Sequence, residues 1–215
     1  MVTTLIFVRH GQSESNLAKV FTGQTDTLLT PLGHKQAENT AQFLKDYPIT
    51  HIYASDLTRV IQTAEPTARM HGLPIVPDRA LREIYAGEWE GKPYSVLRES
   101  YPESYRVWLE DVGRARPDGG ESIVELAARI YEEVDRLVEK HRGECIALFS
   151  HAMPARALGC RWFGYAPKDM AQVKGCANAS VSVVEYGDDG TFRVIHYGYD
   201  AHQGENVTVL PTGLV

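Results

Sequence analysis

Leu5-Ile6-Phe7-Val8-Arg9-His10-Gly11-Gln12 begins with four apolar residues and then turns abruptly polar. The apolar run predicts a buried strand of the parallel kind, which is covered on both faces. Arg9 and His10 would then stand at the carboxyl end of this strand, where open α/β sheets bind their ligands. Histidine can act as a nucleophile, and arginine can hold an anion through paired hydrogen bonds. This strand end is therefore a candidate site.

A second stretch has the same form: Ile146-Ala147-Leu148-Phe149 is apolar and runs into Ser150-His151. An isolated Arg-His pair is usually a solvated strand end, but packing alone does not explain two buried strands that each end in histidine. Arg59 lies one turn inside the helix expected after a further strand, and Glu83 follows another short strand. In a parallel sheet these positions share one edge, so we expect one polar cluster there.

The rest of the chain alternates predicted strands with predicted helices, which indicates a sheet covered by helices on both faces. The expected strands span residues 5–8, 51–54, 75–76, 145–149, 181–186 and 192–197, and the expected helices span 13–18, 31–47, 57–71, 123–142 and 153–163. Thr30 and Ser122 are expected N-caps, and Ser55-Asp56 is expected to cap the helix at 57. The segment 187–190 is typical of a hairpin turn, so at least one strand must be antiparallel. We predict a three-layer α/β/α sandwich around a mostly parallel, mixed sheet.

Residues 81–120 interrupt this alternation. They show no clear strand period, and tyrosine, tryptophan, glycine, proline and charged residues are frequent. We expect one domain over residues 1–215, with an insertion at about 81–120 that serves as a lid and a source of specificity. Residues 205–215 show no pattern and are expected to form a tail.

Composition and charge limit the classes of partner. The chain is 43% hydrophobic and 23% charged, which is ordinary for a globular domain, and its net charge of −6 argues against nucleic acid or an anionic membrane surface. No stretch approaches the length of a membrane span, and no signal peptide is visible. The three cysteines show no paired metal spacing, so a cytoplasmic location is expected. The oligomeric state cannot be read from the sequence.

Several motifs follow one another in a characteristic order. Arg9-His10-Gly11-Gln12-Ser13 with Asn16 resembles R-H-G-E-[ST]-x-x-N, with Gln12 in place of the usual acid. The other matching segments are Thr22-Gly23, Thr30 to Ala37, Ser55 to Ala64, Leu81-x-Glu83, Gly120-Glu121-Ser122 and Ser150-His151. Together they make the chain similar to the histidine phosphatase superfamily, also called the phosphoglycerate mutase-like family, from Leu5 to about Val184.

This resemblance implies a role for each member of the cluster. His10 would be the nucleophile and would form a phosphohistidine, while its other ring nitrogen would need an acceptor such as a backbone carbonyl. Arg9 and Arg59 would hold the phosphoryl oxygens, and a protonated His151 would add a donor once an anion is bound. Glu83 would protonate the leaving oxygen and then take a proton from water.

The resemblance also implies a set of substrate-binding residues, namely Arg9, Asn16, Thr22, Gly23, Arg59, His151 and Ala152. No metal and no other cofactor is expected, because fixed cations would balance the phosphoryl charge. The remaining histidines show no metal spacing and are expected to be ordinary: His34, His51, His71, His141, His196 and His202.

Further polar residues are open to two interpretations. Glu88 and Glu90 are expected to be surface or lid residues rather than acids. Arg82 is expected at the surface, although it could support the pocket. Arg114 and Arg116 could contact a substrate carboxylate, but a solvated loop is favoured. Asn178, which precedes a strand, is expected to be structural.

The sequence motifs indicate the family more clearly than they indicate the reaction. The run Gly87-Glu88-Trp89-Glu90-Gly91 resembles the phosphatase branch, whereas the mutases carry E-R-H-Y-G-G-L and a paired Arg-Arg that holds the carboxylate. Here Ala115 separates Arg114 from Arg116. We therefore expect a phosphomonoesterase acting on a small phosphorylated metabolite, with inorganic phosphate as product or inhibitor. The alternatives are a phosphoglycerate mutase-type phosphoryl transfer and a non-catalytic protein that binds a phosphate ligand.

Overall fold

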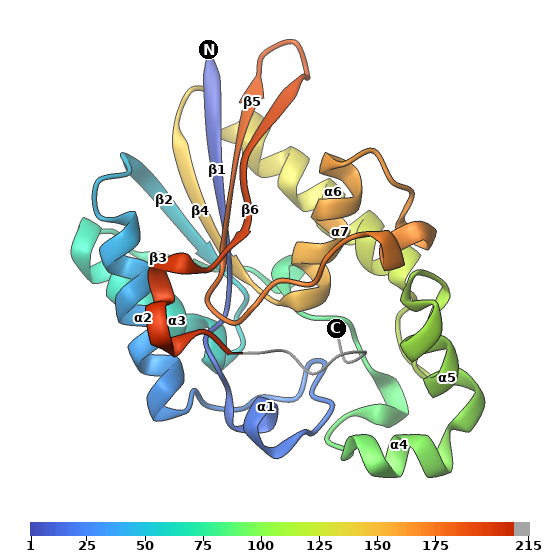
Figure 1. The fold of residues 1–215 in the computed structure, drawn as a ribbon. Helices are drawn as coiled ribbons and strands as arrows, with labels where there is room; N and C mark the ends of the chain where they lie inside the picture. Colours follow the sequence, from blue (N-terminus) through green and yellow to red (C-terminus); the bar gives the residue numbers. More distant parts are fainter. Residues whose placement is uncertain (209–215) are drawn as a thin grey trace.

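The computed structural model describes residues 1–208 and contains a six-stranded sheet with the order β3-β2-β4-β1-β5-β6 (Figure 1). The strands are β1 (Val2–Arg9), β2 (Ile49–Ala54), β3 (Ile75–Pro77), β4 (Cys145–Ser150), β5 (Val181–Gly187) and β6 (Phe192–Tyr199). β1 lies parallel to β4 on one side and antiparallel to β5 on the other. The sheet is therefore mixed, as the hairpin predicted.

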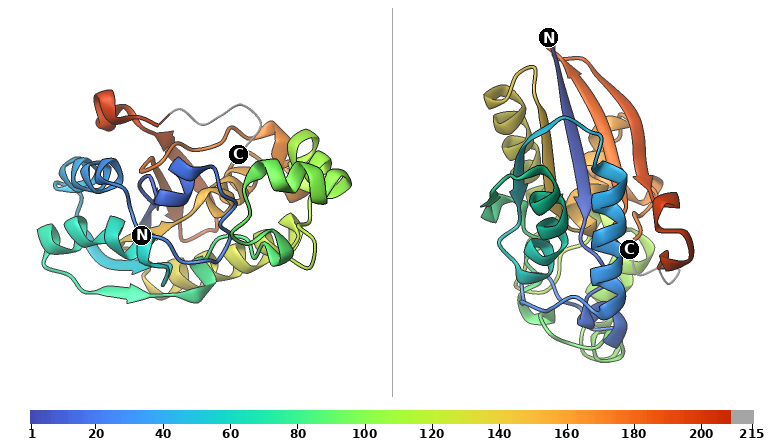
Figure 2. Two further views of the ribbon diagram at one scale, coloured as in Figure 1. Left: turned by 90° about the horizontal axis from the view of Figure 1, so that it is seen from below. Right: turned by 90° about the vertical axis from the view of Figure 1, so that its left-hand side faces the viewer.

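Helices cover both faces of the sheet, so the three-layer α/β/α prediction is confirmed: α2 and α3 lie on one face, and α6 and α7 on the other (Figures 1 and 2). The α-helices are α1 (Glu14–Ala18), α2 (Pro31–Leu44), α3 (Thr58–His71), α4 (Tyr94–Ser100), α5 (Pro102–Glu110), α6 (Ile123–Lys140) and α7 (Ala152–Trp162). Along β1, Ile6 and Val8 pack toward α2 and α3, whereas Leu5 and Phe7 pack toward α6 and α7. This alternation explains why the whole strand is apolar.

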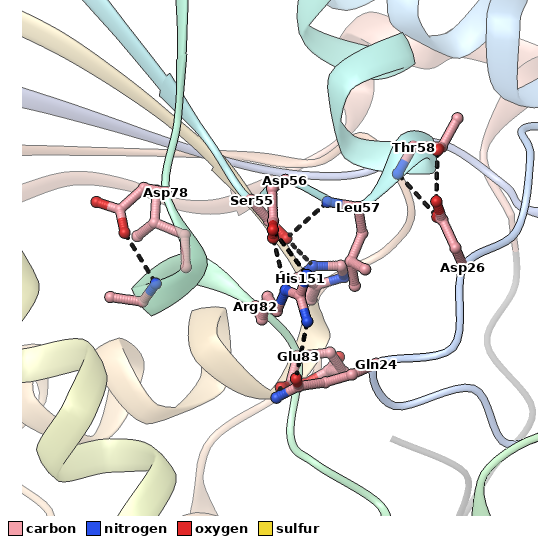
Figure 3. Close-up of polar contacts among 12 residues, drawn as sticks. Gln24, Asp26, Ser55, Asp56, Leu57, Thr58, Asp78, Arg82, Glu83 and His151 are labelled. Carbon is pink, nitrogen blue, oxygen red and sulfur yellow. Dashed lines mark hydrogen bonds and ion pairs between the residues drawn. The ribbon is translucent and has the colours of Figure 1, made fainter.

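Two of the three helix N-caps predicted from the sequence are confirmed. Thr30 caps α2 by accepting a hydrogen bond from the Gly33 amide, and Ser122 forms a capping box with Glu125 at the start of α6. The expected cap of α3 is wrong. Leu57 is its N-cap residue without a side-chain bond, and the carboxylate of Asp26 instead accepts the Thr58 amide at 2.8 Å (Figure 3).

The segment 81–120 follows a 3-10 helix at Arg79–Leu81 and folds into α4, α5 and short 3-10 helices at Gly87–Trp89 and Val112–Arg114. Its buried aromatic side chains extend the core under α6 and α7, and the fully buried Trp89 packs edge-on against Phe21 and Trp108. The Trp89 indole N–H donates to Asp118 at 3.0 Å. These aromatic rings therefore fix the segment against Phe21 and the loop that follows it.

The expected tail is partly ordered structure. Residues 205 and 206 belong to a 3-10 helix (Ala201–Asn206) that packs on α2, where Gln203 donates to the Gln36 carbonyl at 3.1 Å. Residues 209–215 of the expected tail lie outside the described residues. Among the helices of residues 1–208, none combines the length and apolarity needed to cross a membrane.

Candidate active site

His10 follows the last residue of β1 and is fixed by backbone and side-chain contacts. Its amide donates to the Ser150 carbonyl of β4 at 2.9 Å. Its Nδ1 lies 2.7 Å from the Gly11 carbonyl, which can only accept, so Nδ1 carries the proton and Nε2 keeps its lone pair. The acceptor expected from the sequence is thus a neighbouring carbonyl. Burial, followed by the charges of Arg59 and Arg9, lowers the pKa of His10 well below its usual value, so the ring is neutral.

His151 stands beside it at the end of β4, with the two ring centroids 5.2 Å apart. The His151 Nδ1 accepts from Arg59 at 3.3 Å, and its Nε2 lies 2.9 Å from the Ser55 hydroxyl (Figure 3). Burial and the Arg59 charge lower the pKa of His151 well below its usual value. His151 is therefore neutral here, and the protonated form implied by the resemblance would need a bound anion to offset the arginines.

Arg59, in the first turn of α3, holds the loop that follows Phe21. Its guanidinium donates to the carbonyls of Thr25 at 2.9 Å, Gly23 at 2.9 Å and Thr22 at 3.3 Å. Burial lowers the pKa of Arg59 to about 10, which leaves it charged at neutral pH. The sequence suggested only an anion-binding role for this side chain, whereas the structure shows that it also shapes the backbone around the site.

The cavity brings the expected residues together. Arg9 is buried, and its Nη1 donates to the Cys176 carbonyl. His151 is fully buried and contacts Arg59, but it does not line the cavity. The other expected site residues line one cavity, namely Arg9, His10, Asn16, Thr22, Gly23, Arg59, Glu83 and Ala152. A larger residue would not fit at Gly23, because a Cβ at this position would lie 2.4 Å from the Ile84 carbonyl oxygen.

Glu83 reaches the cavity from the segment after β3. One carboxylate oxygen accepts the Ile84 amide at 2.9 Å, and the other accepts the Ala152 and Met153 amides at 3.1 and 3.3 Å. The last two amides open α7, so the helix N-terminus favours the anion. Burial nevertheless outweighs these bonds and the nearby arginines, and it raises the pKa of Glu83. A carboxyl group in this condition suits proton donation.

Asn178 contributes more than the structural role expected from the sequence. Its side-chain amide donates to the carbonyls of His10 at 3.1 Å and Gly11 at 3.3 Å, and to Asn16 Oδ1 at 3.1 Å. The Gly11 carbonyl is also the acceptor for the His10 ring. Asn178 therefore supports the carbonyl that fixes the tautomer of His10, and no local motif marks this link across the chain.

Glu90, expected only as a surface or lid residue, also holds the loop that follows Phe21. It is half-buried, and its two carboxylate oxygens accept the amides of Gln24 at 2.7 Å and Thr25 at 2.9 Å, together with the Thr25 hydroxyl at 2.6 Å. Arg82 supports the same loop, as one interpretation allowed, by pairing with Asp56 at 2.6 Å and reaching Gln24 at 3.3 Å (Figure 3).

The two arginines considered for a carboxylate clamp lie elsewhere. Arg114 pairs with Asp111 at 3.1 Å, and Arg116 pairs with Glu125 at 2.6 Å. Both side chains are more than half exposed, and neither lines the cavity. The solvated interpretation therefore holds for both.

Residues 5–199 match the family described as the histidine phosphatase superfamily (branch 1). Phosphoserine phosphatase 1 of Hydrogenobacter thermophilus is 33% identical over 94% of this chain and 94% of its own. Probable phosphoglycerate mutase GpmB of Yersinia pestis is 38% identical over 71% of this chain and 70% of its own. A solved mycobacterial glucosyl-3-phosphoglycerate phosphatase superposes with a TM-score of 0.83 at 28% identity, covering 93% of this chain and all of its own.

The fold, the paired histidines and these relatives define an enzyme of the phosphatase class. The chain belongs to the histidine phosphatase superfamily, branch 1, as its motifs predicted.

Proposed function

We propose that this protein hydrolyses a small phosphorylated metabolite through a phosphohistidine on His10, without a metal ion. The observation that carries the proposal is the contact between His10 Nδ1 and the Gly11 carbonyl, which leaves a free lone pair on Nε2 inside a cavity with two buried arginines. Arg9 and Arg59 supply the positive charge that a phosphoryl group needs, which is the usual contribution of a metal.

The proposed reaction has two steps. In the first, His10 Nε2 attacks phosphorus, the ester P–O bond breaks, and the leaving oxygen takes the Glu83 proton. In the second, Glu83 removes a proton from a water molecule, whose oxygen attacks phosphorus and breaks the P–N bond. Inorganic phosphate then leaves, and His10 and Glu83 regain their starting forms. Phosphate should consequently also act as a product inhibitor.

The segment 81–120 is proposed to act as the lid and to select the leaving group. Tyr94 and Trp108 from this segment line the cavity next to Phe21, and Met153 lines it from α7. These side chains provide an apolar wall beside the anion-binding residues, which suits a metabolite with an apolar or ring-bearing leaving group.

A mutase remains the second candidate, because one similar protein is named a probable phosphoglycerate mutase. A mutase must hold its intermediate through a carboxylate contact, and Arg114 and Arg116 are both paired at the surface instead. Given 3-phosphoglycerate, the protein should release inorganic phosphate or leave it unchanged. Rapid formation of 2-phosphoglycerate with little phosphate released would make the mutase correct.

The direct experiment measures hydrolysis of an aryl phosphate in the presence of a chelator. The wild type should turn over and should carry acid-labile, base-stable phosphate during turnover. His10→Ala should lose both, whereas His34→Ala, which changes an exposed residue of α2, should keep both. Background activity in the wild type would instead support a binding protein, and activity in His10→Ala would remove the nucleophile assignment.

A further inference from the structure

A second cluster of titratable side chains lies at the opposite edge of the sheet from the catalytic cavity. His51 is near the start of β2, and His141 and Glu144 lie in the turn between α6 and β4. This is the end of the sheet where β2 and β4 begin, the upper end in Figure 1. The six residues of β4, roughly 20 Å at the rise of a strand, separate it from His151.

Each of these side chains brings one potential ligand atom into the cluster, and the two imidazole rings lie with their centroids 4.0 Å apart. Glu144 Oε2 lies 2.9 Å from His51 Nδ1 and 3.5 Å from His141 Nδ1, and all three atoms lie within 4.8 Å of one another. Ligands of a tetrahedral cation with bonds of 2.0–2.1 Å stand about 3.3 Å apart. Two of the three separations are thus already close to that value, and a bound cation would replace the direct contacts of Glu144 with the imidazoles.

The backbone fixes this juxtaposition. The Glu144 amide donates to the His141 carbonyl at 3.0 Å and closes the turn. Gly143 within it has a φ of +79°, a conformation that favours glycine, and its amide donates to the Thr3 hydroxyl at 3.0 Å. On the other side, the register of β2 against β4 shifts between Ile49 and His51. Such an irregularity redirects side chains, here beside the turn.

Neighbouring groups orient the ligands as in a metal site. His141 Nε2 lies 2.8 Å from the Tyr53 hydroxyl oxygen and can donate a hydrogen bond to it. Nδ1 of the same ring then keeps its lone pair, on the side of Glu144. The same oxygen accepts from Lys140 at 3.0 Å. Thr50 donates to Glu144 Oε2 at 2.9 Å.

The cluster can be reached from solvent. A neutral imidazole and an ionised carboxylate are the forms that bind a cation. The side chains of His51 and Glu144 are 41% and 40% exposed, so a cation can enter and keep a water ligand.

We propose that His51, His141 and Glu144 form a binding site for a borderline first-row divalent cation, of which Zn²⁺ is the representative. Two imidazoles and one carboxylate are a ligand set that suits this class, with water in the fourth position. The ligands come from β2 and from the α6–β4 turn, so the cation would join two segments of the fold. Its effect should fall on stability and not on turnover.

The test is a calorimetric titration of chelator-treated protein with Zn²⁺ in phosphate-free buffer. The wild type should bind one equivalent and gain thermal stability. His51→Ala and Glu144→Gln should each weaken binding by about tenfold or more. His34→Ala, a surface histidine on α2, should bind like the wild type.

A competing location is the catalytic histidine pair, so His10→Ala is included. The proposal requires that His10→Ala keep its zinc equivalent, and that one equivalent leave the wild-type hydrolysis rate unchanged. Absence of binding in the wild type would overturn it. So would equal losses in His51→Ala and His34→Ala, or loss of binding in His10→Ala but not in Glu144→Gln.

Discussion

The Glu83 carboxyl group is subject to opposing forces. Three backbone amides and two arginines favour its anion, while burial favours its neutral form and prevails, so that its pKa is raised. The amides of Ala152 and Met153 aim the carboxyl into the cavity without making it too weak a proton donor. This residue therefore combines fixed geometry with a proton that it can release.

Glu83→Gln should slow alkyl phosphates by about 100-fold or more and aryl phosphates far less, because a good leaving group needs no proton. A raised pKa also predicts that turnover of alkyl phosphates falls as pH increases through the Glu83 pKa, since the acid form is lost. Steady-state rates against pH on both substrates measure this. In Glu83→Gln that alkaline decline should disappear.

Glu88→Gln is the matched control, because Glu88 is exposed and accepts from Tyr101 outside the cavity. An equal loss on both substrate types in Glu83→Gln would place the proton donor elsewhere.

Individual site residues were predictable to different degrees. Arg9, His10 and Glu83 stand within short motifs next to strands, so their shared location follows from parallel pairing alone. Asn178 has no such motif, and its bonds to the His10 and Gly11 carbonyls depend on a contact between distant parts of the chain. His51 and His141 likewise showed no ligand spacing in the sequence, because only pairing of β2 with β4 brings them together.

At the scale of elements, the loop of residues 22–25 is held from two sides. Arg59 of α3 binds its carbonyls, and Glu90 of the inserted segment binds its amides. The segment 81–120 therefore does more than line the cavity, since its Glu90 also holds two backbone amides of this loop.

Glu90→Gln should weaken inhibition by inorganic phosphate by about tenfold, because misplacing a binding loop is costly even far from the reacting atoms. The substitution replaces one carboxylate oxygen with an NH₂ donor facing amides that also donate. The inhibition constant for phosphate measures the effect. Glu88→Gln removes a charge from the same segment without touching the loop. Identical constants in the two variants would show that Glu90 does not support the site.

The helix starts predicted from the sequence are confirmed where the capping side chain bonds within its own helix. Thr30 and Ser122 cap their helices because their hydroxyls bond to amides three residues along. Ser55 is also a serine placed before a helix, but its hydroxyl contacts His151. The Thr58 amide at the start of α3 donates to Asp26 instead. A tertiary partner thus replaced the local one, which the sequence pattern did not reveal.

The free energy of unfolding of the whole protein should fall in acid, because His10 and His151 are buried as neutral rings. Their pKa values in the folded protein lie well below the usual 6.5, which applies to the unfolded chain. Below about pH 6.5 the unfolded state binds more protons, so the free energy of unfolding falls as pH falls. Each ring that stays neutral costs about 1.4 kcal/mol per pH unit in that window.

Urea unfolding at pH 7.5 and pH 5 measures this loss, and His10→Ala should show a smaller difference than the wild type. His34→Ala, which changes an exposed ring, should retain the full difference. The same pH dependence in His10→Ala as in the wild type would contradict the argument.

The layered architecture was predictable because strands and helices alternate and because the hairpin turn requires an antiparallel pair. The order of the strands was not predictable from these patterns. It depends on which apolar strands pair over long separations, and every central strand here is apolar enough to pair with several others.

The central place of β1 has a consequence for how the protein is made. Val8 pairs with Phe149 on one side and with Val181 on the other, so both neighbours leave the ribosome long after β1 itself. At 5–20 residues per second, the wait is roughly 7 to 28 s for β4 and roughly 9 to 35 s for β5. During this time an apolar segment with two unpaired edges is exposed, which is a template for aggregation. The nascent chain therefore carries an aggregation-prone segment through most of its synthesis, and a product that stops before β5 leaves one edge of β1 without its partner.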